Sequence, residues 1–150
     1  MEALISVIIP VYKTEKTLRN CLESVLSQEL EPTEIIVVND ASPDHAAEIL
    51  REYEGRITVL THSQNKGLLS ARLSGIRAAN GKYILFVDSD DELVPGILKK
   101  LHDKAEETQA DITAFGAKLI SYDAAIPRKQ IQKIEKTMAA LMGQTTKTRR

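Results

Sequence analysis

Apolar runs rich in β-branched residues alternate along the chain with segments whose apolar residues recur at helical spacing. Each run is short and nearly continuous, which is typical of strands covered on both faces of a sheet. The pattern predicts strands over residues 4–10, 34–39, 56–61 and 82–87, with a weaker one over 111–120.

Amphipathic segments separate these runs. The one after the first run places on a single helical face the apolar residues Leu18, Cys21, Leu22, Val25 and Leu26. Helices are expected after the N-cap Thr14, from Pro43 with Ser42 as its cap, over 68–79, and from Pro95. The alternation of strands and helices predicts an α/β protein, a three-layer α/β/α fold with a mostly parallel central sheet.

The composition excludes several classes of partner and site. The 150 residues are 43% hydrophobic and 27% charged, with a net charge of −1, which gives no electrostatic reason to expect nucleic acid as a partner. Cys21 is the only cysteine, so an intrachain disulfide and a cysteine-based zinc site are both excluded. No apolar run approaches the roughly 20 residues that cross a bilayer, and we expect a cytoplasmic location.

Three carboxylates directly follow the last strong strand run. Asp88, Asp90 and Asp91 lie within four residues, and no basic residue follows them before Lys99. Like charges this close repel one another, so the cluster is typical of a site for a divalent cation or a hydroxylated ligand. Acids also favour a helix N-terminus, but that explains one carboxylate more easily than three.

The first two strands also end in distinctive segments, at 10–12 with Tyr12 and at 39–42 with Asn39, Asp40 and Ser42. The carboxyl ends of parallel strands share one edge of a sheet, so these segments and 88–91 are expected to form one site. The loop over 10–16 contains no glycine, which argues against a dinucleotide-binding turn, and no phosphate-cradling Gly-Lys-Ser/Thr loop is present. A nucleotide diphosphate at this edge would therefore need a metal ion held by the acids.

Four segments resemble family 2 glycosyltransferases, in that family's order and spacing. They are Ser6–Tyr12, Glu34–Ser42, Asn65–Arg72 and Phe86–Asp91, and the match covers about residues 4–100. The resemblance implies the GT-A fold, inverting transfer from a nucleotide-sugar donor, with UDP as the expected nucleotide, and Mn²⁺ or Mg²⁺ as cofactor. It implies a saccharide or lipid-linked acceptor in cell-wall or polysaccharide biosynthesis, and leaves homo-oligomers and peripheral association with the inner face of the membrane open.

The same resemblance gives the motif positions roles in donor binding. It implies a nucleobase pocket at Pro10, Val11 and Tyr12, a hydrogen bond to the nucleobase from Asp40, a nucleotide contact at Arg72, donor contacts at Asp88 and Ser89, and a metal held by Asp90 and Asp88. Asp91 follows the motif without an assigned role. Lys13, Asn39 and Leu73 depart from the family's commonest residues, which leaves the identity of the donor open.

The resemblance also divides the chain. It implies a nucleotide-sugar-binding domain over 1–125, followed by a predicted helix over 126–142 and a basic tail over 143–150 that is expected to be disordered. In this family the carboxylate that deprotonates the acceptor lies beyond the donor-binding half, and Glu135, between two lysines, is not assigned to that role. We therefore expect a C-terminally truncated chain with an unknown catalytic base, or alternatively a module that binds the donor without transferring it.

Other classes are less compatible with the sequence. A protein-interaction domain without a ligand would not need the acids, and a phospho-receiver would need an aspartate where Thr61-His62-Ser63 stands. A sugar-phosphate nucleotidyltransferase would need a glycine-rich loop after the first strand. The three histidines share no metal-ligand spacing and are expected at the surface, whereas Cys21 is expected in the core.

Overall fold

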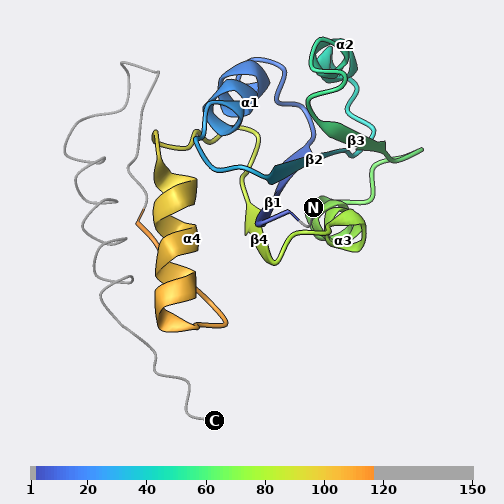
Figure 1. The fold of residues 1–150 in the computed structure, drawn as a ribbon. Coiled ribbons are helices and arrows are strands. Elements are labelled where there is room, and N and C mark those ends of the chain that lie inside the picture. The colour runs from blue at the N-terminus through green and yellow to red at the C-terminus, as the bar shows by residue number, and fades with distance from the viewer. Residues whose placement is uncertain (1–2, 117–150) are drawn as a thin grey trace, which may run out of the picture.

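Four parallel strands form the centre of the computed structural model, which describes residues 3–116 (Figure 1). They are β1 (Ile5–Val11), β2 (Thr33–Asn39), β3 (Thr58–Thr61) and β4 (Tyr83–Phe86), in the order β3-β2-β1-β4. The helices are α1 (Leu18–Leu26), α2 (Ala46–Arg51), α3 (Leu68–Ala78) and α4 (Ile97–Thr108). The predicted α/β architecture with a parallel sheet is confirmed.

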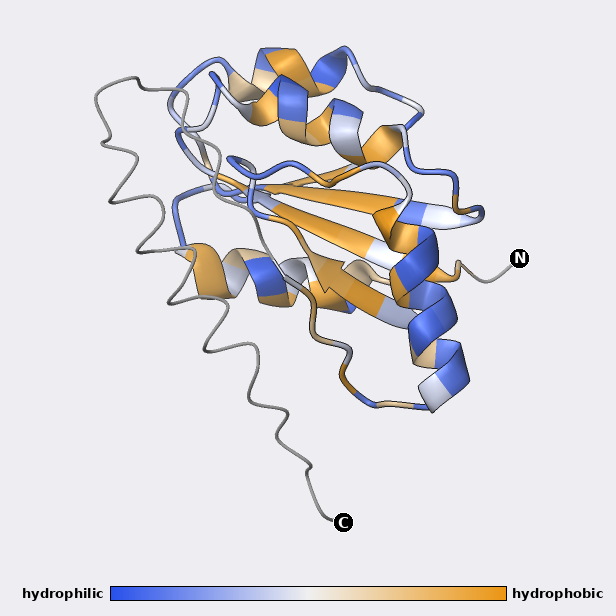
Figure 2. Cartoon of the chain, turned by 90° about the vertical axis from the view of Figure 1, so that its left-hand side faces the viewer, coloured by the Kyte–Doolittle hydropathy of each residue, from blue (hydrophilic) through white to orange (hydrophobic). Residues whose placement is uncertain are grey.

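The larger core lies on one face of the sheet. Alternate residues of β1, such as Val7 and Ile9, pack there against α1, α2 and the first turn of α4, with Leu22, Leu50 and Leu98 among the buried contacts. Figure 2 shows the apolar strands enclosed between helices above and below. Burial on this face explains why β1 and β2 have nearly uninterrupted apolar sequences. Cys21 belongs to this core, as predicted.

The opposite face is covered by α3 and has a smaller core. Ile36 and Val38 of β2 pack there against Ala71 of α3. Small residues on this side of the helix bring it close to the sheet: a Cβ atom added at Gly75 would lie 2.4 Å from Cγ2 of Ile8. Because α1 and α3 lie on opposite faces, the carboxyl end of β1 opens between them.

Some predicted boundaries are wrong for identifiable reasons. The first helix begins at Leu18 rather than after Thr14: residues 15–17 form a turn closed by the Thr14 carbonyl, and the Thr14 hydroxyl is bonded to Ser89 instead of capping a helix amide. The second helix begins at Ala46, whose amide is capped by the Asp44 carboxylate and not by Ser42. Similarly, the fourth begins at Ile97, after Gly96.

The weak strand predicted over 111–120 is not formed in its described part, since residues 111–116 have no strand pairing. Its remainder, the end of the domain predicted over 1–125, the helix predicted over 126–142 and the tail at 143–150 lie outside the described residues. Between residues 3 and 116 no helix has the length and apolarity needed to cross a membrane.

Candidate functional site

A pocket of about 430 Å³ opens at the carboxyl ends of β1, β2 and β4. It lies where the strand order reverses, because the chain leaves β1 toward β2 on one side while β4 adds on the other. This is the position at which open parallel sheets bind ligands. The pocket is lined by Pro10, Val11, Tyr12, Asp40, Asn65, Gly67, Leu68, Ala71, Asp88, Ser89 and Asp90.

The structure therefore brings seven of the eight predicted site residues to one pocket. The eighth, Arg72, does not line it but donates a hydrogen bond of 2.7 Å to Oδ1 of Asp88. Four other lining residues lie between Asn65 and Ala71. They belong to the motif that ends at Arg72, in which the resemblance gave a role to Arg72 alone. The roles of these residues in binding a donor stay predictions.

The segments that follow β1 and β2 each contain one strained residue and are hydrogen-bonded to each other. Lys13 and Ala41 both have left-handed backbone, with φ of 58° and 54°, a conformation that costs a non-glycine residue roughly 1–2 kcal/mol. The Lys13 amide donates to Oγ of Ser42 at 2.7 Å, and the Ser42 amide donates to Oδ1 of Asn39 at 2.9 Å. These bonds offset the strain and leave Tyr12 half-exposed at the mouth of the pocket.

Asp40 is buried and has three hydrogen-bond donors. Its Oδ1 accepts from Nδ1 of His62 at 2.6 Å and from the amide of Lys66 at 2.9 Å, and its Oδ2 accepts from the amide of Gly67 at 2.8 Å. Burial by itself raises the pKa of Asp40, but these hydrogen bonds outweigh it and hold the pKa below its ordinary value. Asp40 is therefore an ionised carboxylate in the wall of the pocket.

The expectation that all three histidines lie at the surface is wrong for His62. Its side chain is 9% exposed, and its Nε2 lies 2.8 Å from Oγ of Ser74. By contrast, His45 is exposed, and His102 is partly covered by an edge-on contact with Tyr83. His62 is buried because β3 runs parallel to β2 and ends beside Asp40, a relation that no local sequence pattern reveals.

The acid loop, residues 88–91, is held in place by two threonines just before α1. Oγ of the buried Ser89 lies 2.8 Å from Oγ1 of Thr14, and its carbonyl accepts a hydrogen bond of 3.0 Å from Oγ1 of Thr17. The Cys21 thiol lies 3.6 Å from the carbonyl of Asp88. With Ser89 anchored inward, Asp88 and Asp90 line the pocket. Sequence reasoning missed the two threonines, which are more than 70 residues away.

The charges of the acid loop are only partly balanced. Arg72 pairs with Asp88 and lies over the ring of Phe86, 5.5 Å from its centroid. The Asp90 carboxylate makes no hydrogen bond or ion pair with any residue between 3 and 116. Partial burial, together with the charges of Asp90 and Asp88, raises the pKa of Asp91. The loop thus favours a positive ligand group.

The donor atoms at this loop suit Mg²⁺ or Mn²⁺ shared with a phosphate. Asp88 and Asp90 offer carboxylate oxygens, the ligands that these hard cations prefer. Within residues 3–116 no three or more acidic, histidine or cysteine side chains form a metal-binding group. A cation held by Asp88 and Asp90 would therefore need further ligands besides the acidic, histidine and cysteine side chains of this part of the chain.

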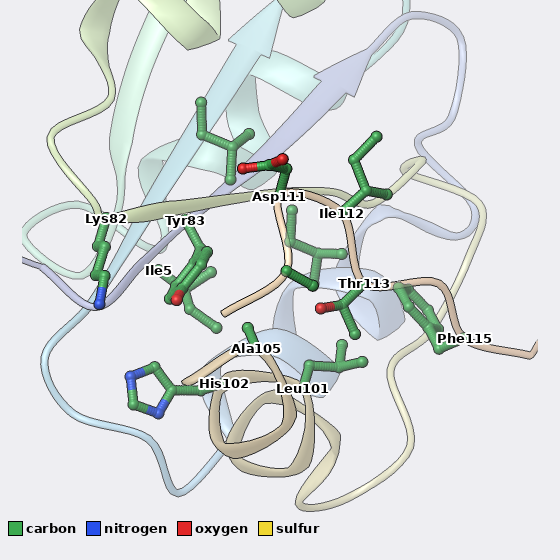
Figure 3. A pocket seen from close by; sticks show the side chains of 13 residues that line it. Ile5, Lys82, Tyr83, Leu101, His102, Ala105, Asp111, Ile112, Thr113 and Phe115 are labelled. Carbon is green, nitrogen blue, oxygen red and sulfur yellow. The ribbon is translucent and has the colours of Figure 1, made fainter. Parts of the chain in front are cut away.

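A second pocket, of about 380 Å³, lies between β4, α4 and residues 110–115 (Figure 3). Its lining is mainly aliphatic and aromatic, with Leu101, Ala105 and Phe115 among the residues facing it. Two of its polar groups are already paired, since Lys82 and the Tyr83 hydroxyl both donate to Glu106. This pocket lacks convergent polar groups and does not resemble a nucleotide site.

The buried thiol of Cys21 allows a direct check of how firmly α1 closes under the acid loop. Burial, with the charges of Asp91 and Asp90, raises the pKa of this thiol to about 12. Because the thiolate is the reactive form, we expect labelling by a disulfide reagent at pH 8 to be at least about 100-fold slower than in guanidinium. Cys21 is the sole cysteine, so the measured rate of labelling is that of Cys21 alone. Equal rates in both conditions would contradict the packing described.

Comparisons with known proteins identify what this architecture resembles. A model described as Glycosyl transferase family 2 matches residues 6–149. The Bacillus subtilis glycosyltransferase EpsJ is 44% identical over 119 residues, which are 77% of this chain and 34% of the relative. The poly(ribitol-phosphate) beta-glucosyltransferase of Bacillus spizizenii is 39% identical over 115 residues, 73% of this chain and 18% of the relative.

A solved structure extends the comparison to the fold. S. aureus TarS 1-349 in complex with UDP-GlcNAc is 29% identical and gives a TM-score of 0.70, with 85% of this chain and 37% of that chain covered. The chain thus spans well under half the length of each of these proteins.

Proposed function

The chain belongs to glycosyltransferase family 2 and has the GT-A fold that its sequence predicted, and from that premise we propose that its pocket binds a UDP-sugar together with Mn²⁺ or Mg²⁺. In a protein that also carries an acceptor site, this donor would be transferred to an acceptor hydroxyl with inversion. The observation that carries the proposal is the meeting of Tyr12, Asp40 and Asp90 in one pocket at the reversal of strand order. TarS, the structural relative, was solved with UDP and with UDP-GlcNAc.

The nucleobase would occupy the part of the pocket between Val11, Tyr12 and Asp40. Tyr12 presents a half-exposed ring suited to contact with a planar base. Oδ2 of Asp40 accepts a single hydrogen bond, from Gly67, so one lone pair stays available for an N–H group of the ligand. The imide N–H of uracil is such a donor, whereas the ring nitrogen at the same position of cytosine carries no hydrogen.

The diphosphate would lie toward the acid loop. Asp88 and Asp90 would hold the metal ion, and the ion would supply positive charge that stabilises the departing diphosphate. Arg72 is close enough to hold Asp88 in place and to add a second positive charge. Ser89 would act through the backbone, since its anchored side chain fixes the direction of the two neighbouring carboxylates.

The acceptor is proposed to be a saccharide or a lipid-linked saccharide presented at the cytoplasmic face of a membrane. The name of the Bacillus spizizenii relative describes transfer of glucose to poly(ribitol-phosphate), which is compatible with a hydroxyl-rich polymer as acceptor. The group that deprotonates the acceptor is not assigned among residues 3–116, and Glu135 lies outside the described residues.

A second function, donor binding without transfer, is favoured by one observation. The aligned part of this chain is 34% of EpsJ and 37% of the TarS chain, so the described pocket corresponds to a minor part of each relative. Release of UDP from UDP-GlcNAc, measured with the purified 150-residue chain, separates the two functions. Release that depends on Mn²⁺ would eliminate the binding-only alternative.

Calorimetric titration with UDP in the presence of Mn²⁺ or EDTA tests the proposed function. We expect Mn²⁺ to strengthen UDP binding at least tenfold, because the ion bridges the acid loop to the diphosphate. UMP is the matched control, since it retains the nucleobase and ribose but has no β-phosphate, and its affinity should rise much less. UDP affinity that is unchanged by Mn²⁺ would contradict the role given to the acid loop.

A further inference from the structure

Three hydrogen-bonded polar side chains, one buried and two partly buried, form a short chain behind the nucleobase part of the pocket. Nδ1 of His62 lies 2.6 Å from Oδ1 of Asp40, and Nε2 of the same ring lies 2.8 Å from Oγ of Ser74. The side chains of His62 and Asp40 are 9% and 3% exposed, so water cannot readily replace the bond between them. These three residues, here called the His62 relay, connect the end of β2, the end of β3 and the middle of α3.

His62 is held by its backbone amide as well as by its two ring nitrogens. The His62 amide donates a hydrogen bond of 2.9 Å to the carbonyl of Asn39 and so extends the pairing of β2 with β3 by one residue. The position of the ring is therefore set by the sheet, and Asp40 follows Asn39 directly. A side chain fixed in this way orients its hydrogen-bond partner and does not merely follow it.

The two hydrogen-bond partners of His62, Asp40 and Ser74, determine which ring nitrogen carries a proton. An ionised carboxylate only accepts hydrogen bonds, so Nδ1 of His62 must carry the proton in this contact. Nε2 then accepts from the Ser74 hydroxyl or, if the ring is charged, donates to it. In either state the N–H at Nδ1 is directed at Oδ1 of Asp40.

This directed bond determines which Asp40 oxygen remains for a ligand. Oδ1 is filled by His62 and the amide of Lys66, whereas Oδ2 has only the amide of Gly67. Without the imidazole, Oδ1 would lose one of its two donors, and the carboxylate could rotate between orientations. The turn over residues 65–67, which lines the pocket, would lose part of its support, because both its amide bonds end on Asp40.

We propose that His62, with Ser74 behind it, is a positioning residue that aims Asp40 at the nucleobase and so determines the preference of the pocket for uracil. The inference rests on the proposed function, since it gives Asp40 a ligand to recognise. His62 itself does not line the pocket. It acts through the direction of the Asp40 carboxylate, and Ser74 acts through the tilt of the His62 ring.

The test compares UDP with CDP, in Mn²⁺, for the wild-type chain and for variants of the relay. Cytosine cannot donate at the position where uracil does, so the ratio of the two affinities measures how well Asp40 is aimed. We expect His62→Ala to weaken UDP binding about tenfold and CDP binding less than twofold, so that the preference for UDP falls about tenfold. His62→Asn keeps an N–H near the position of Nδ1 and should recover most of the preference.

Two further variants separate positioning from a loss of folding. His102→Ala removes a histidine that lines the second pocket, between β4 and α4, and not the nucleotide pocket, and should leave both affinities unchanged. Should His62→Ala fail to fold, Ser74→Ala gives the answer, with an expected two- to fivefold fall in the preference for UDP. A His62→Ala or Ser74→Ala chain that folds and keeps the wild-type ratio would overturn the role of the relay. A wild-type chain that binds UDP and CDP equally would instead overturn the proposed uracil site.

Discussion

Replacing Asp90 by asparagine is expected to remove most of the gain in UDP affinity that Mn²⁺ provides, a loss of at least about tenfold or 1.4 kcal/mol. Asp90 lines the pocket and has no ion-pair partner within residues 3–116. Asparagine is nearly isosteric but uncharged, so it keeps the shape of the loop and weakens its hold on the cation. Calorimetric titration of the variant with UDP, in Mn²⁺ and in EDTA, measures the change.

The control for this substitution is Asp103→Asn. Asp103 is an exposed acid on α4 that pairs with Lys99 at 2.6 Å and does not line the pocket. Its replacement removes the same charge from the protein and should leave the effect of Mn²⁺ intact. An Asp90→Asn chain with the full metal-dependent gain would show that the cation is held elsewhere.

A substitution at Asp88 is expected to be harder to interpret, because Asp88 pairs with Arg72 and would also bind the cation. Arg72 already offsets its charge across a 2.7 Å contact that is partly exposed to solvent, and such a pair contributes only about 0–1 kcal/mol. A cation could therefore also bind Asp88, because weakening the Arg72–Asp88 ion pair would cost little free energy. Asp90 lacks such a neighbour, which makes it the sharper probe of the metal.

Much of the fold follows from local sequence. β1 and β2 are buried on both faces, and their nearly continuous apolar sequences were enough to identify them. The third predicted helix was nearly correct, because Gly67 and Asn80-Gly81 bound it. The boundaries of the first and second helices were wrong, because Thr14, Ser42 and Asp44 bond with distant residues, an outcome that propensity cannot anticipate.

The strand-end residues of the pocket could be predicted from the sequence, but the residues that hold them in place could not. Three polar strand ends had to meet at one edge once the sheet was parallel, and that rule alone brought together Tyr12, Asp40 and Asp88. The supports depend on register and helix placement. His62 lies 22 residues from Asp40, and Thr14 lies 75 residues from Ser89. A lone histidine or threonine carries no signal of such a partner.

The sequence of α3 illustrates the same limit in the packing. Its apolar residues are mostly exposed, including Leu69 and Leu73, while the side that meets the sheet is formed by Ala71 and Gly75. An amphipathic pattern would have assigned the leucines to the core. The close approach of helix and sheet reverses this, because only small residues fit between the helix axis and β1. Glycines at such contacts are therefore expected to control stability.

Gly81→Ala is expected to destabilise the fold by about 3 kcal/mol, a large share of a typical domain's stability. A Cβ atom at Gly81 would lie 2.5 Å from the amide nitrogen of Ser6 and 2.8 Å from the carbonyl carbon of Ile5. Both atoms belong to the backbone of β1, the strand paired with both β2 and β4, so they cannot move without breaking the ladder. Urea denaturation followed by circular dichroism measures the change in the free energy of unfolding.

Gly116→Ala and Gly75→Ala complete the experiment. Among the described residues, no atom lies within 4 Å of a Cβ added at Gly116, so its substitution should change the free energy of unfolding by less than about 0.5 kcal/mol. At Gly75 the nearest atom is Cγ2 of the buried Ile8 side chain, and not a backbone atom, so the core must repack around it and about 1–3 kcal/mol is expected. The order of the three losses is the decisive result. If Gly81→Ala cost no more than Gly116→Ala, the tight junction between the end of α3 and the start of β4 would not exist as described.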